Sequence, residues 1–124
     1  MSLRLLGLLQ WFGLLGAAGA WAAQHLVGYG VTDASCSVAG IHWGVAQDAW
    51  QIGLMVGACI VIVAAEGAAA IVFRETRDVE ETAGPPLGRL HFFATAALVA
   101  NLLFLGIVVM DGLASVLDVA CRQS

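Results

Sequence analysis

The chain has 124 residues, of which 60% are apolar and 11% are charged, with a formal net charge of −4 and a mean hydropathy of +0.90. About a quarter of the residues in a soluble domain are charged, so this chain has too few polar groups to cover a water-soluble globule. Its five scattered arginines, with no lysine, form no basic patch, which argues against nucleic-acid binding. We therefore expect a membrane protein whose surface largely faces lipid.

Three apolar stretches are each long enough for a bilayer-spanning helix, which needs about 20 residues. We predict transmembrane helices over residues 3–28, 48–73 and 90–117. The segment 29–47 is rich in glycine, serine and other loop-forming residues. The segment 74–89 is polar and contains two consecutive prolines, which cannot continue a helix. The predicted fold class is therefore all-α, with one membrane domain of three transmembrane helices.

The first predicted helix has an alternative interpretation as a cleaved signal peptide. Arg4 precedes a leucine-rich stretch, and small residues surround Trp21, as in secretory signals. The apolar run is longer than that of a typical signal peptide, however. We therefore interpret this segment as a retained membrane anchor.

The arginines predict how the helices are oriented, because short cytoplasmic loops carry an excess of cationic residues. Arg4 precedes the first predicted helix, and three further arginines lie between the second and the third: Arg74, Arg77 and Arg89. With three spans these four fall on one side of the membrane, and only Arg122 falls on the other. We therefore expect a multi-pass protein of the bacterial inner membrane, with its N-terminus in the cytoplasm and its C-terminus outside.

Two cysteines share the predicted outer side, which is an oxidising compartment in bacteria. They are Cys36, in the first predicted loop, and Cys121, in the C-terminal tail. We expect a disulfide between them, which closes a long loop and contributes roughly 4 kcal/mol in the chain-entropy model. The alternative is that the pair binds copper or another thiophilic metal, although no CxxC or CxxxC spacing favours this. Cys59 is interpreted as a small buried apolar residue.

Three histidines raise the hypothesis of a heme-binding pair. His25 lies near the outer end of the first predicted helix and His91 at the inner start of the third. A rise of about 1.5 Å per residue separates them by roughly 30 Å in depth, so they cannot ligate one iron. His25 and His42 can meet at the outer face, but nothing in their spacing requires it. We expect no bound cofactor.

Polar residues inside the predicted spans are the candidates for buried or interaction sites. Glu66 is the most informative, because an ionisable group at that depth is costly and usually faces protein or water. Either it conducts protons, or it is paired with a polar group of a neighbouring helix, or its side chain extends toward the inner membrane surface. Asn101, near the membrane centre, is predicted to hold helices together by hydrogen bonding. The remaining candidates are Gln24, His25 and Asp111, toward the outer ends of their helices.

Small residues recur at a spacing of four, which lets helices approach closely. Gly53 and Gly57 form a GxxxG motif in the second predicted helix, and Gly13 and Ala17 are a similar pair in the first. We predict that these faces pack against other helices.

Short motifs in the first and third predicted helices carry a family resemblance. The first reads Gly16-Ala17-Ala18-Gly19-Ala20-Trp21-Ala22-Ala23-Gln24 and is followed by Tyr29 and Cys36. The third contains His91-Phe92-Phe93, Asn101-Leu102-Leu103-Phe104-Leu105 and Gly112, and ends in Cys121-Arg122. In these motifs the chain resembles small bacterial membrane proteins that are encoded beside the subunits of heme–copper cytochrome c oxidases. The resemblance covers about half of the chain and leaves out the middle helix and the segment 74–89.

The resemblance implies association with a respiratory oxidase, and only the outer cysteine pair is carried over from it, as a structural feature. The leading hypothesis is a non-catalytic accessory subunit that binds no heme or copper, packs against the redox subunits and lipid, and shapes a cytochrome c or supercomplex contact. One alternative is an assembly factor that delivers copper or heme. Another is a homo-oligomeric proton-conducting protein that uses Glu66. No phosphate-binding loop, HExxH motif or nucleophile elbow is present, so we do not expect an enzyme.

Overall fold

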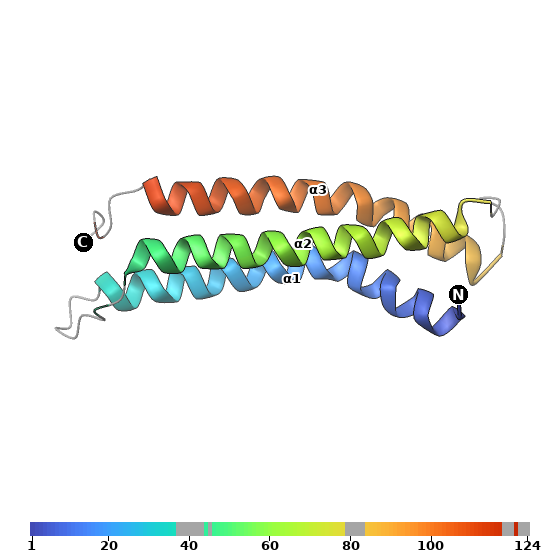
Figure 1. Cartoon of the computed structure of the whole chain (residues 1–124), viewed down its shortest axis with the longest axis horizontal. Helices are drawn as coiled ribbons and strands as arrows, with labels where there is room; N and C mark the ends of the chain where they lie inside the picture. The colour runs from blue at the N-terminus through green and yellow to red at the C-terminus, as the bar shows by residue number, and fades with distance from the viewer. Residues whose placement is uncertain (37–43, 45, 79–83, 118–120, 122–124) are drawn as a thin grey trace.

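The computed structural model describes residues 1–36, 44, 46–78, 84–117 and 121. Within these residues the chain forms three α-helices: α1 (Leu3–Cys36), α2 (Gln47–Thr76) and α3 (Leu87–Leu117) (Figure 1). Each helix is long and apolar enough to cross a membrane. The predicted fold class, an all-α protein with three transmembrane helices, is confirmed.

The helices are longer than predicted, above all α1, which continues to Cys36, eight residues beyond its predicted end. The predicted loop over residues 29–47 is therefore wrong for residues 29–36, and also for Gln47, which begins α2. Glycine, serine and threonine favour turns in isolation. Here the Ser35 hydroxyl donates to the Val31 carbonyl of the preceding turn, 2.7 Å away, and contacts with α2 hold the added turns. Helices α2 and α3 each extend three residues further than predicted toward the segment between them.

Consecutive helices run antiparallel, so α1 and α3 point the same way (Figure 1). The N-terminus and the α2–α3 connection lie at one end of the bundle, which we call the arginine end because Arg74, Arg77 and Arg89 lie there. The α1–α2 connection and the end of α3 lie at the other, which we call the disulfide end. The three helices therefore cross the bundle one after another in chain order, as the three predicted spans do.

All three helices contribute to two buried apolar clusters that follow each other along the bundle. The cluster nearer the arginine end consists of Leu6, Val72, Leu90 and Ala94. The cluster nearer the disulfide end consists of Ala17, Ala58, Ile62 and Val108. The helices therefore meet along the length of the bundle rather than at one crossing point.

Small residues let α1 and α2 approach each other closely. A Cβ built on Gly13 would lie 3.0 Å from the backbone nitrogen of Ala69. Ala17 and Ala65 have no exposed surface. Lipid tails are as apolar as leucine, so helices in a bilayer associate through close van der Waals contact rather than through the hydrophobic effect. Gly13 and Ala17, one of the predicted small-residue pairs, supply that contact.

The outer surface of the bundle is apolar on all three helices. Large side chains are widely exposed, among them Leu8 on α1, Ile60 on α2 and Leu103 on α3. In water such a continuous apolar surface would cause association. It suits a protein surrounded by lipid or by other transmembrane helices.

Replacing Gly13 by leucine is expected to force α1 away from α2, because the new side chain meets backbone atoms of Ala69 that cannot rotate aside. We expect a loss of about 1–3 kcal/mol of stability, typical of overpacking, measured as a lower melting temperature in detergent. Gly7→Leu is the matched control, since a Cβ at Gly7 has nothing within 4 Å. Equal melting temperatures for the two variants would contradict the close α1–α2 contact.

Candidate functional site

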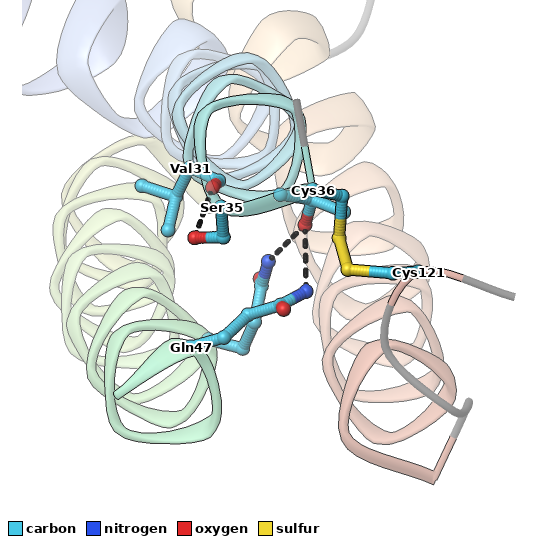
Figure 2. The surroundings of a disulfide bond; sticks show 7 residues. Val31, Ser35, Cys36, Gln47 and Cys121 are labelled. Atoms are coloured by element: carbon cyan, nitrogen blue, oxygen red, sulfur yellow. Dashed lines mark hydrogen bonds between the residues drawn. A yellow bond between two sulfur atoms is a disulfide. The ribbon is translucent and has the colours of Figure 1, made fainter. Parts of the chain in front are cut away.

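A disulfide joins Cys36, the last residue of α1, to Cys121, beyond the end of α3 (Figure 2). The two Cα atoms are 5.3 Å apart, although the residues are separated by 85 positions in the chain. The predicted disulfide is confirmed. The third cysteine, Cys59, is free, lies in the middle of α2 and packs beside the buried cluster nearer the disulfide end.

Two glutamines of α2 form hydrogen bonds with the end of α1 that carries Cys36 (Figure 2). The Gln51 amide nitrogen donates to the Gly28 carbonyl at 3.1 Å and to the Thr32 hydroxyl at 3.2 Å. The Gln47 amide nitrogen donates to the same hydroxyl at 3.1 Å. Gln51 is buried, and a Cβ on Gly28 would lie 2.9 Å from its side-chain oxygen, so Gly28 leaves the space that Gln51 fills. We call these four residues and the disulfide the clasp.

The sequence did not identify the glutamines of the clasp or Thr32 as interaction residues. The sequence predicts Gln47 at the end of a loop and Gln51 in an apolar span. A signal was present, because residues four apart lie on one face of a helix, and Gln47 and Gln51 have that spacing. Their partners lie 15 to 23 positions earlier, so the pairing itself required the fold.

Gln24 links α1 to α3. Its side chain is buried, and its amide nitrogen donates to the Val108 carbonyl at 3.2 Å. Its side-chain oxygen is buried without a hydrogen-bond partner. The structure thus places this predicted polar residue inside the bundle, between the two helices that share a direction.

His25 and Asp111 lie on the outside of the same α1–α3 contact. The His25 Nδ1 atom is 3.4 Å from an Asp111 carboxylate oxygen, and the two side chains are 57% and 34% exposed. The His25 ring also stacks on Trp21, with ring centroids 5.9 Å apart. The sequence indicates both residues as interaction candidates but does not pair them. Which residues of α1 lie beside which residues of α3 becomes known only from the fold.

The pair stands at the edge of an open groove between α1 and α3, with a volume of about 630 Å³. Its lining is mostly apolar and consists of Trp21, His25, Leu102, Leu103, Gly106, Ile107, Met110 and Asp111. We call this the α1–α3 groove. It is an open, largely apolar surface that contains one polar pair.

Glu66 and Asn101 lie between the two ends of the bundle. Asn101 is 1% exposed, and both polar atoms of its side chain are buried without a hydrogen-bond partner. Glu66 is half-buried, and one of its carboxylate oxygens is buried and unpartnered. Asn101 thus lies in the helix interface, as its predicted role requires, but without the expected hydrogen bond.

Gly53 and Gly57 face away from α1 and α3. Both are exposed, and a Cβ on either would have nothing within 4 Å. Close approach inside the bundle falls instead to other glycines, including Gly16, beside Ala65, and Gly112, beside Met55. The GxxxG motif is therefore available to a helix from outside the chain.

His25 and His91 lie toward opposite ends of the bundle. His25 contacts Asp111, which is twenty residues along α3 from His91, or about 30 Å. The His91 ring stacks on Phe73, and its Nδ1 atom is 3.1 Å from the Thr76 hydroxyl. The two rings are too far apart to bind one iron. His42 and Arg122 lie outside the described residues.

Comparison with protein-family models, with curated proteins and with solved structures finds no match to this chain. The oxidase-linked resemblance therefore rests on the short motifs of the first and third helices alone.

The disulfide predicts a particular pattern of stability losses. Cys36→Ser, Cys121→Ser and the double variant should lose the same amount, up to about 4 kcal/mol in the chain-entropy model, because each removes one and the same bond. Melting temperatures in detergent measure this, with Cys59→Ser as the control that leaves the bond intact. Additive losses, or melting of the unsubstituted protein that is insensitive to reductant, would show that the bond does not hold the fold.

Proposed function

We propose that this chain is a non-catalytic accessory subunit of a larger complex in the bacterial inner membrane. The expected partner is a heme–copper cytochrome c oxidase, against whose transmembrane helices the bundle packs. The oxidase is suggested by the resemblance described above, whereas the docking role is supported by the surface of the bundle.

The observation that carries the proposal is the exposed His25–Asp111 pair at the edge of the α1–α3 groove. Residues 92–110 of α3 contain no charged residue and span about 28 Å, close to the thickness of a bilayer core. Asp111 therefore lies at the boundary of the hydrocarbon. Ionisable side chains at such depths usually face protein or water rather than lipid, and a partner helix in the groove provides that environment.

A second surface supports the same role. The Gly53–Gly57 face of α2 is open, and glycines at this spacing let another helix approach the backbone closely. It lies on α2, whereas the groove lies between α1 and α3. A protein with two such faces is suited to contact helices of a larger complex on more than one side.

The disulfide supports the proposed orientation and argues against metal delivery. Disulfides persist in oxidising compartments, so the disulfide end fits the outer side, as the arginine distribution also indicates. A copper-delivering thiol pair needs free sulfur atoms, and both sulfur atoms of Cys36 and Cys121 are used in the bond. An accessory subunit needs only the rigid outer end that this bond provides.

Affinity purification from native membranes in mild detergent tests the proposal. We expect the tagged chain to bring down larger integral membrane proteins, identified by mass spectrometry, with the absorption spectrum of a heme–copper oxidase. Recovery of the chain alone would refute the accessory role. Recovery with another membrane complex would refute the oxidase and retain the accessory role.

Gly106→Phe is the sharpest variant for the groove, because it fills the groove at a position where a Cβ has nothing within 4 Å. We expect at least a tenfold loss of co-purified partner with an unchanged melting temperature. Gly19→Phe is the matched control: Gly19 is also open, and lies two residues from Trp21, on the other side of α1. Undiminished recovery with Gly106→Phe would show that the groove is not the docking surface.

A further inference from the structure

We propose that the exposed side of α2 at the arginine end binds an aminophospholipid. The headgroup lies in a hollow lined by charged side chains, and one acyl chain lies along small residues of α2 toward the middle of the membrane. This site is separate from the α1–α3 groove and from the Gly53–Gly57 face, and it does not depend on the accessory role.

The hollow lies at the last turns of α2 and has a volume of about 430 Å³. We call it the α2 hollow. The described residues that line it are Ile71, Arg74, Glu75, Arg77 and Asp78. Their separations of three, four and seven residues place them along one side of the helix. One exposed apolar side chain therefore lies beside four charged ones, as the junction between a lipid headgroup and its acyl chains requires.

The α2 hollow lies at the boundary of the hydrocarbon. Thr76, among the charged residues of the hollow, has its hydroxyl 3.1 Å from the Nδ1 atom of His91 on α3. His91 immediately precedes the uncharged stretch 92–110, whose length of about 28 Å is close to the thickness of a bilayer core. The charged residues of α2 that begin at Arg74 are therefore level with the lipid headgroups.

Two of the four charged side chains in the α2 hollow have no partner. The Arg77 Nε atom is 3.7 Å from an Asp78 carboxylate oxygen, so these two charges offset each other. Within the part of the chain that the structure describes, neither the Arg74 guanidinium nor the Glu75 carboxylate takes part in an ion pair or a hydrogen bond. One cationic and one anionic group of the hollow therefore remain for a ligand.

The charges of the lining indicate a zwitterionic headgroup. A purely anionic headgroup is attracted by Arg74 but repelled by Glu75. An ethanolamine headgroup carries a phosphate, which accepts two hydrogen bonds from a guanidinium, and an ammonium, which donates to a carboxylate. A choline headgroup has no N–H to donate, and the described lining contains no aromatic side chain of the kind that binds a quaternary ammonium. Ethanolamine therefore fits both unpaired groups.

The same side of α2 leaves room for an acyl chain. Gly67 and Ala64 lie four and seven residues before Ile71, and all three are exposed. A Cβ built on Gly67 would have nothing within 4 Å. The ten residues from Ala64 to Arg74 span about 15 Å, or half the thickness of a bilayer core. An acyl chain along these small residues therefore stays within the leaflet of its headgroup.

Native mass spectrometry of the protein released from vesicles tests the site, with phosphatidylethanolamine, phosphatidylcholine and phosphatidylglycerol in equal parts. We expect the intact protein to retain phosphatidylethanolamine most. Glu75→Gln should lower its retention relative to phosphatidylcholine about two- to fivefold, the effect of losing an exposed ion pair. Asp48→Asn is the matched control, because it removes an exposed carboxylate at the other end of α2. Both positions are exposed, so we expect unchanged melting temperatures.

Two further variants test the phosphate and the acyl chain. Arg74→Gln should lower the retention of all three lipids, because each carries a phosphate. Gly67→Phe should do the same by blocking the acyl chain, with Gly7→Phe as its control, since Gly7 is equally open and lies toward the same end of the bundle. A preference for phosphatidylglycerol, or retention of phosphatidylethanolamine that Glu75→Gln leaves unchanged, would overturn the aminophospholipid. Retention unchanged by Arg74→Gln and Gly67→Phe would overturn the site itself.

Discussion

The clasp at the disulfide end is the interaction on which the rest of the bundle depends. One covalent bond joins α1 to the segment beyond α3, and three hydrogen bonds from Gln47 and Gln51 join α2 to α1. In lipid, apolar side chains provide little drive for helices to associate, so specific contacts must set their register. The clasp sets it at one end, and the close Gly13–Ala69 contact continues it along α1 and α2.

The spans could be predicted from composition, because a bilayer demands about 20 apolar residues per helix. The disulfide could also be predicted, since three spans put both cysteines on one side of the membrane, and the arginine distribution predicts that this is the outer, oxidising side. The end of α1 could not. Residues 29–36 include Gly30 and Ser35, whose local preference is for turns, and they stay helical in contact with α2 through Thr32. Local preference was overridden by contacts between residues far apart in the chain.

Several polar residues, although not those of the clasp, could be identified from the sequence, but their placement could not. Asn101 is buried in the interior and Glu66 is half-buried, whereas His25 and Asp111 meet at the surface of the bundle. Each helix is apolar around most of its circumference, so the hydrophobic pattern does not reveal which side faces its neighbours. The structure supplies that information, and the proposed docking role of the His25–Asp111 pair rests on it.

Amide hydrogen exchange of the protein in lipid nanodiscs, before and after reduction, tests the clasp most directly. Residues 29–36 form the last turns of α1, between Gln24 and the disulfide. They are therefore the helical turns that depend most on the clasp. The account predicts slow exchange over these residues in the oxidised protein and clearly faster exchange after reduction, while residues 60–70 of α2 remain protected in both states. Fast exchange over residues 29–36 in the oxidised protein, or exchange unchanged by reduction, would contradict it.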